Sequence, residues 1–115
     1  MIQVKRVYDK PSPADGYRVL VDRLWPRGLR KQDAGINLWL KDVGPSAELR
    51  RWFAHAPERW DEFRRRYAAE LAGKGRAVDV LREKSGSGKL TLVFAAKDAE
   101  HNNAVALMEY LASKH

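Results

Sequence analysis

The segment LTLVFAAKDAEHNNAVAL, residues 90–107, contains the pattern that decides the fold. Its first six residues, Leu90–Ala95, form a short apolar run that is typical of a strand buried on both faces. A helix is predicted to follow this strand, because apolar residues then recur at helical spacing. These residues are Ala104, Leu107, Met108 and Leu111. We expect Asp98 to be the N-cap of this helix, which would place His101 and Asn102 in its first turn.

Two further strands are predicted near the N-terminus. Residues Ile2–Tyr8 alternate between two faces and include β-branched side chains, so they are expected to form a strand. Residues 9–16 contain two prolines and a glycine, which indicates a turn. Residues Tyr17–Val21 are an apolar run bounded by that turn and by a charged loop, and they predict a second buried strand.

Three helices are predicted between residues 45 and 84, and residues 31–44 are assigned to a loop with one irregular turn. Ser46 is the expected N-cap of the first helix, and Pro57 is expected in the first turn of the second. The second helix is amphipathic, because aromatic and leucine side chains recur every three or four residues. Those residues are Trp60, Phe63, Tyr67 and Leu71. A third helix contains Val78 and Leu81, and the glycine-rich residues 85–88 predict a short turn before the strand at Leu90.

The order strand, strand, three helices, strand, helix predicts an α/β fold with a small, mostly parallel sheet flanked by helices. A length of 115 residues favours a single compact domain. The chain contains no cysteine, no apolar run of the roughly 18 residues that a membrane span requires, and no signal-peptide pattern. We therefore expect a cytoplasmic protein without disulfides and without membrane contact.

Ligands of open α/β sheets gather at the carboxyl ends of the strands, and two unusual segments follow strands there. One is VDRLWPRGLRK, residues 21–31, and the other is AKDAEHN, residues 96–102. The net charge is +7, and residues 4–31 contain eight cations and three acids. Arginine side chains and a helix N-terminus would together attract a phosphate or carboxylate group. The sequence therefore predicts a site for a phosphate-bearing small molecule such as a nucleotide.

Each residue of this predicted site has a binding interpretation and a structural one. Arg23, Arg27 and Lys97 would bind the anion; Trp25 would stack on a flat ring, and Gly28 would let the backbone approach the ligand. Alternatively, Trp25 plugs the end of the sheet and the charged side chains only pair with one another. A base or acid is available if a reaction occurs, because His101 beside Asp22 or Asp98 would titrate near neutral pH. No metal site or cofactor motif is recognisable, and the sequence leaves the oligomeric state open.

A nucleic-acid-binding module is the alternative function. It would use the basic residues between 5 and 31 together with the arginines at 64–66. No helix-turn-helix pattern supports a sequence-specific reader.

Four blocks of the sequence resemble the YeaO-like bacterial family, a domain-of-unknown-function group. They are KRVYD at 5–9, DGYRVLVDRLWPRGLRK at 15–31, RWFAHAPERWDEFRRRYAAEL at 51–71 and LTLVFAAKDAEHNNAVAL at 90–107. The resemblance covers nearly the whole chain and implies a compact α/β domain, but no established activity. It adds Arg6, Tyr8, Pro26 and Asn102 to the candidate site. Ala56 and Phe94 depart from the aspartate and tyrosine expected at these two positions.

Overall fold

A computed structural model describes residues 1–113 of the chain. Its sheet has four strands, and every neighbouring pair is parallel. The strands are β1 (Ile2–Arg6), β2 (Tyr17–Leu20), β3 (Leu38–Trp39) and β4 (Leu90–Phe94). Their order is β1-β4-β2-β3, so β4 is flanked on both sides. The predicted α/β fold with a mostly parallel sheet is confirmed, and all strand carboxyl ends lie at one edge of the sheet.

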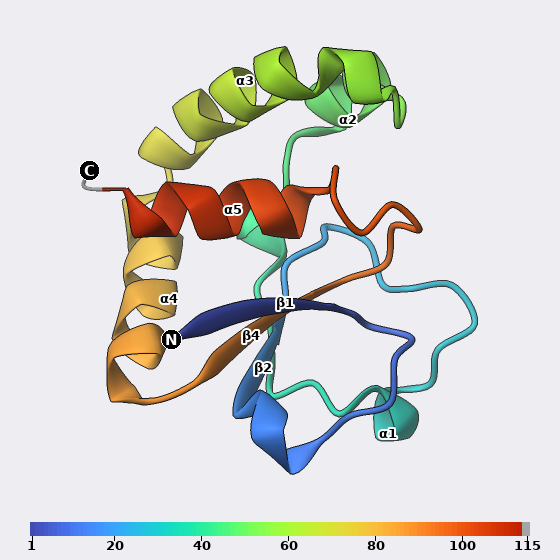
Figure 1. The fold of residues 1–115 in the computed structure, drawn as a ribbon, viewed down its shortest axis with the longest axis vertical. Coiled ribbons are helices and arrows are strands. Elements are labelled where there is room, and N and C mark those ends of the chain that lie inside the picture. Colours follow the sequence, from blue (N-terminus) through green and yellow to red (C-terminus); the bar gives the residue numbers. More distant parts are fainter. Residues whose placement is uncertain (114–115) are drawn as a thin grey trace.

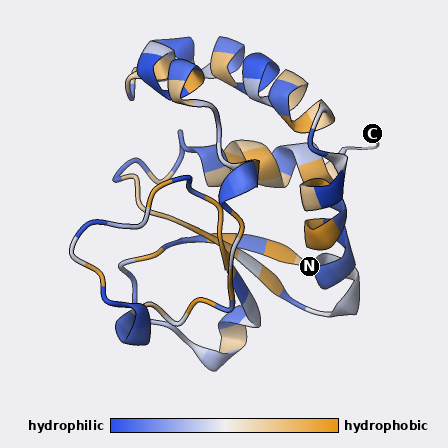
Figure 2. Ribbon diagram, turned by 180° about the vertical axis from the view of Figure 1, so that it is seen from behind, coloured by the Kyte–Doolittle hydropathy of each residue, from blue (hydrophilic) through white to orange (hydrophobic). Residues whose placement is uncertain are grey.

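The four long helices pack on one face of the sheet (Figure 1). They are α2 (Ala47–Phe53), α3 (Trp60–Ala72), α4 (Gly75–Ser87) and α5 (Asn103–Ala112). The helix α5 contacts both β1 and β4, and α3 packs against α5. Hydrophobic and hydrophilic residues alternate along α3 (Figure 2), as the predicted amphipathic pattern requires.

The strand alternation separates two hydrophobic cores. Leu92 and Phe94 of β4 and Val19 of β2 point toward the helices and join the larger core. Leu20 and Val93 point the other way and join a smaller core, which is covered mainly by residues of the loops on either side of the short helix α1 (Lys31–Ala34) and by β3. Successive side chains of a strand face opposite sides of the sheet, so a fully buried strand such as β4 contributes side chains to both cores. The residues that cover the smaller core are Trp25, Leu29, Ile36 and Trp39.

A polar cluster occupies the rest of the second face. The side chains of Asp15 and Arg18 form an ion pair of 2.6 Å, and Lys5 approaches the same carboxylate at 3.1 Å. Arg18 also donates to the backbone carbonyls of Ala34 and Gly35 at 3.1 and 2.9 Å. This buried guanidinium group therefore fastens the end of α1 to β2.

Several boundaries differ from those predicted. The sequence predicts a loop with one irregular turn for residues 31–44, but they contain α1, β3 and a 3-10 helix at Lys41–Val43. Leu38 and Trp39 pair with β2 over only two positions, which is too short for an alternating pattern to be visible. The predicted turn at 85–88 is also wrong, because Ser85, Gly86 and Ser87 complete the last turn of α4. Ser46 is confirmed as the N-cap of α2, since its side chain accepts the Leu49 N–H at 3.1 Å.

The helices of the described part of the chain, residues 1–113, are all too short or too polar to cross a membrane. The helix layer supplies one wall of the candidate site and the loop after β2 supplies the other.

Candidate functional site

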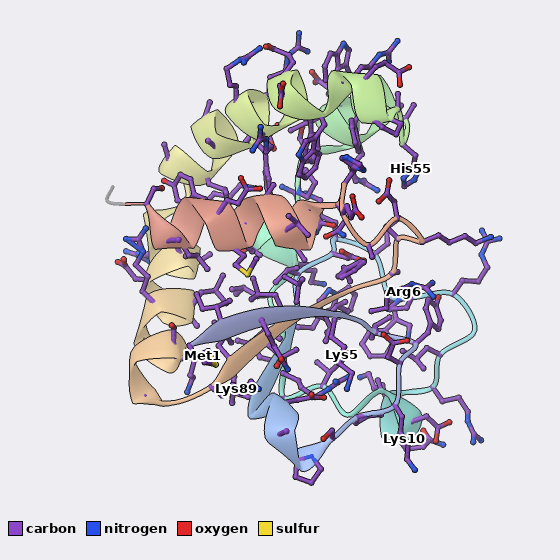
Figure 3. All side chains as sticks on the ribbon, viewed as in Figure 1. Met1, Lys5, Arg6, Lys10, His55 and Lys89 are labelled. Atoms are coloured by element: carbon purple, nitrogen blue, oxygen red, sulfur yellow. The ribbon has the colours of Figure 1, made fainter. Side chains whose placement is uncertain are left out.

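A cavity of about 620 Å³ opens at the carboxyl edge of the sheet. The loop after β2, the start of α5 and the α2–α3 region all contribute to its wall. Figure 3 labels His55 and Arg6 at the end of the molecule where β1 finishes, whereas Met1 and Lys89 lie where the strands begin. Seven residues of the predicted site line the cavity. They are Tyr8, Asp22, Arg23, Trp25, Arg27, His101 and Asn102. Pro26, which the family resemblance also added to the candidate site, lines the cavity as well.

Asp22 is fixed inside this cavity by hydrogen bonds from two segments. Its Oδ2 accepts the backbone N–H of Ala95 at 2.9 Å, and its Oδ1 accepts the Asn103 side-chain amide at 3.0 Å. Asn103 also donates to the Val21 carbonyl at 3.0 Å, which joins α5 to the end of β2. Burial raises the pKa of Asp22, because the effect of these hydrogen bonds and of the Arg50 charge is smaller than that of desolvation. The Asp22 carboxylate is thus a hydrogen-bond acceptor of fixed orientation that is partly shielded from solvent.

Three arginines line the cavity at different depths. Arg23 is half-buried, and its Nε donates to the carbonyls of Gly44 and Pro45 at 3.0 and 2.8 Å. Arg27 and Arg50 are exposed, and neither guanidinium group hydrogen-bonds or ion-pairs with another residue among positions 1–113. Their charges are therefore available to a ligand, while Arg23 is held in place by the backbone.

The loop after β2 is built around aromatic contacts. Trp25 packs edge-on against Trp39, with ring centroids 5.4 Å apart, and its Nε1 donates to the Leu29 carbonyl at 2.6 Å. Trp25 thus packs against the smaller core, as its structural interpretation expects, and it also lines the cavity. Stacking of Trp25 on a ligand ring stays a prediction. Tyr8 donates its hydroxyl to the Arg27 carbonyl at 2.8 Å and so holds the tip of the loop. Gly28 has φ +75° and serves a turn closed by Leu29, without lining the cavity.

Arg6 lies outside the cavity lining and has a structural contact. Its guanidinium group donates to the carbonyls of Ala96 and Ala95 at 2.9 and 3.3 Å, and it lies 5.1 Å from the centroid of the Tyr8 ring. These contacts hold the chain where it leaves β4. Arg6 therefore supports the loop that leads to α5.

The segment before α5 departs from its predicted capping pattern. Asn102, not Asp98, is the N-cap of α5, because its Oδ1 accepts the Val105 N–H at 3.0 Å. Asp98 instead accepts the backbone N–H groups of Glu100 and His101 in the preceding loop, at 2.9 and 3.0 Å. Asp98 and Asn102 are both residue types that favour the N-cap position, and the path of the loop places Asn102 there. Lys97 is exposed and does not line the cavity.

His101 and Asp98 form a partly exposed side-chain pair in the loop before α5. His101 Nδ1 lies 2.9 Å from Asp98 Oδ2, and the His101 ring meets Trp60 edge-on at 5.4 Å between centroids. Hydrogen bonds from the Glu100 N–H and from His101 lower the pKa of Asp98. Asp98 orients the imidazole but lies outside the cavity lining. Within residues 1–113, no group of three or more histidine or carboxylate side chains is arranged to hold a metal ion.

The sequence analysis misses three polar side chains of the cavity: Arg50, His55 and Asn103. Arg50 and Asn103 lie in helices, and no local pattern indicates which helical face meets a cavity. His55 follows Ala54 in the break after α2, where both residues have positive φ angles of 56° and 47°. Such backbone is strained for residues other than glycine and clusters at functional sites, so these two angles are a structural signal that the sequence conceals.

The arginines at 64–66 are paired with acids on the helical surface. Arg64 contacts Asp61 at 2.6 Å and Glu109 at 2.8 Å. Arg65 and Arg66 both contact Glu62, at 2.6 and 2.9 Å. This part of α3 therefore presents neutralised pairs to solvent.

Comparison with known proteins relates the whole chain to uncharacterised bacterial sequences. An uncharacterized protein of Mycobacterium tuberculosis strain H37Rv is 46% identical over 110 residues, covering 96% of this chain and 92% of the relative. The uncharacterized protein YeaO of Escherichia coli strain K12 is 43% identical over 112 residues, covering 97% of both chains. No solved structure matches the chain. A family model described as the inactive DUF488-N3 subclade matches residues 1–115, and the chain therefore belongs to this YeaO-like DUF488 family.

Proposed function

We propose that this protein binds a phosphate-bearing small molecule, such as a nucleotide, in the cavity at the carboxyl edge of its sheet. The observation that carries the proposal is the excess of arginine over acidic side chains in the cavity lining. Three arginines, two histidines and one carboxylate line it: Arg23, Arg27, Arg50, His55 and His101, with Asp22. Guanidinium groups bind phosphate through two parallel hydrogen bonds, and among the described residues no acid hydrogen-bonds or ion-pairs with Arg27 or Arg50.

The size and the walls of the cavity support a small organic ligand. A volume of about 620 Å³ falls within the roughly 300–1,000 Å³ range of small-molecule sites. Apolar side chains complete the wall, and such surfaces suit the flat ring or the carbon skeleton of a ligand. They include Leu24, Trp25, Phe53 and Phe63.

Binding without a reaction is the form of this function that we favour. The matching family model is described as an inactive subclade, which supports binding without turnover. In this proposal the His101–Asp98 pair positions an imidazole at the cavity and takes no part in acid–base catalysis.

The test is a thermal-shift titration with inorganic phosphate, ribose 5-phosphate, adenosine monophosphate and a short single-stranded oligonucleotide. A ligand at about 100 times its Kd stabilises a protein by roughly 2.7 kcal/mol, which raises the Tm visibly. We expect such a shift with a phosphate ester, and its loss in Arg27→Ala and Arg50→Ala. Arg30→Ala is the matched control, because Arg30 is exposed, pairs with Asp33 at 2.9 Å and does not line the cavity.

Two results would contradict the proposal. One is the absence of any shift with the three small molecules. The other is a shift with the oligonucleotide alone that persists in Arg27→Ala and Arg50→Ala and disappears at high salt, which would indicate nonspecific binding by surface charge.

A further inference from the structure

We infer that the cavity selects a phosphate ester with adjacent hydroxyl groups, in which the diol donates to Asp22 and the phosphate binds Arg27 and Arg50. The inference rests on the proposed function and specifies how a ligand would be oriented. It follows from the different depths at which the acidic and basic groups lie, and from the hydrogen-bonding capacity that Asp22 retains.

The basic groups at the mouth and the carboxylate inside define a polarity. Arg27, Arg50 and His55 are exposed, whereas Asp22, Arg23 and His101 are half-buried and the neighbouring Asn102 is buried. Of the two half-buried basic groups, Arg23 donates to the carbonyls of Gly44 and Pro45 and His101 contacts Asp98. A phosphate group would meet the exposed guanidinium groups first and would be repelled by the carboxylate if it moved inward. The phosphate end of a ligand therefore belongs at the mouth.

Asp22 retains acceptor capacity toward the cavity. Each oxygen of a carboxylate has two lone pairs, and each Asp22 oxygen uses one, for the Ala95 N–H and for the Asn103 amide. Asp22 has no ion-pair partner within 4.0 Å among residues 1–113. One acceptor site per oxygen remains, on a carboxylate whose orientation is fixed by two different elements.

Two adjacent hydroxyl groups match this arrangement. A carboxylate that is held in one orientation can accept one hydrogen bond from each hydroxyl, as acidic residues do for the ribose of bound dinucleotides. A bare phosphate ion offers no such donors, and in its dianionic form it would suffer repulsion from Asp22. Asp22 therefore discriminates between phosphate compounds that the arginines alone would bind alike.

The experiment measures Kd by titration calorimetry for adenosine monophosphate, its 2′,3′-dideoxy analogue and inorganic phosphate. On the wild-type protein, we expect adenosine monophosphate to bind about tenfold more tightly than the dideoxy analogue, since hydrogen bonds to a charged group are strong. In Asp22→Asn we expect that preference to fall to about twofold, and inorganic phosphate to bind more tightly because a like charge has been removed. Asp33→Asn is the matched control, because Asp33 is an exposed carboxylate whose one ion-pair partner within residues 1–113 is Arg30.

The outcomes separate the inference from the proposed function. Equal affinity of the wild-type protein for the nucleotide and its dideoxy analogue would overturn the inference while leaving phosphate binding intact, and this comparison needs no variant to fold. Tighter binding of all three probes to Asp22→Asn would also overturn it. If none of the probes binds the wild-type protein, the proposed function fails and the inference fails with it.

Discussion

Asp15 and Arg18 form an ion pair of 2.6 Å in which both side chains are only 4% exposed. A buried charge requires a partner, because its desolvation is costly. The pair is completed by hydrogen bonds from Arg18 to two backbone carbonyls and by the approach of Lys5 to Asp15. The second face of the sheet is thus held together at its amino half by charge and at its carboxyl half by aromatic packing.

Replacing Asp15 with asparagine is expected to lower the free energy of unfolding by about 3 kcal/mol, because Arg18 would remain buried without its anion. Urea denaturation followed by circular dichroism measures this change. Asp33→Asn removes an exposed ion pair and should cost less than about 1 kcal/mol. An equal decrease in the free energy of unfolding of Asp15→Asn and Asp33→Asn would show that burial of the Asp15–Arg18 pair has no energetic consequence.

The contribution of Asp15 is expected to depend on pH. Burial acts to raise its pKa, but hydrogen bonds from Lys5, the Ser12 N–H and Arg18 outweigh burial, so the pKa lies below its usual value. A depressed pKa stabilises the fold above the unfolded-state value of about 3.9, and this stabilisation is lost as the pH falls through the folded-state pKa. The stability difference between wild type and Asp15→Asn should therefore be constant above about pH 5 and should shrink below about pH 4. The pKa of Asp22 is raised, so its contribution to the free energy of unfolding changes with pH in the opposite direction. This contribution is the same in wild type and Asp15→Asn and therefore cancels in the difference between them.

Ala54→Gly is expected to stabilise the protein by about 0.5–1 kcal/mol. Ala54 ends α2 with φ +47°, a conformation in which glycine is less strained than alanine. Thermal unfolding measures the change. Ala69→Gly, at an exposed position inside α3, should destabilise by about 1 kcal/mol. Destabilisation by both substitutions would contradict the left-handed backbone at Ala54.

Gly86→Ala is expected to stabilise the protein by up to about 1 kcal/mol. Gly86 lies inside α4, and a Cβ at this position would meet no atom within 4 Å. Chemical denaturation tests this expectation. If residues 85–88 formed the flexible turn that their composition predicts, the substitution would have little effect or would destabilise the fold.

Gly44→Ala is expected to destabilise the protein by about 1–3 kcal/mol and to weaken phosphate binding. A Cβ at Gly44 would lie 2.8 Å from Arg23 Cγ and 2.9 Å from the Arg23 backbone nitrogen, so Arg23 would have to move. Denaturation and the thermal-shift titration report the two effects. Gly75→Ala, where a Cβ meets nothing within 4 Å, is the matched control. Unchanged stability together with unchanged phosphate binding would contradict the tight packing of Gly44 against Arg23.

The sequence predicts those features that depend on local periodicity. Strands β1, β2 and β4 and the long helices follow from alternation and from helical spacing, and the loop after β2 follows from its charges. The pairing of β3 depends on Trp39 meeting β2 and on its Nε1 donating to the Asp22 carbonyl at 2.7 Å, a tertiary contact without a local signal. Arg50 reaches the cavity only because of the direction in which α2 packs. Gly86 remains helical although its intrinsic propensity favours a turn, because α4 packs against β4.

The position of β4 in the sheet determines when the sheet can form during synthesis. Gln3 and Thr91 are hydrogen-bonded at 2.8 Å although 88 positions separate them. The strands β1 and β2 do not pair with each other, because β4 lies between them. A nascent chain that ends before residue 90 therefore leaves β1 unpaired and β2 paired only with the two-residue strand β3, and such open strand edges are exposed to aggregation. Formation of the sheet, and of the cavity at its edge, must await the emergence of the last quarter of the chain from the ribosome.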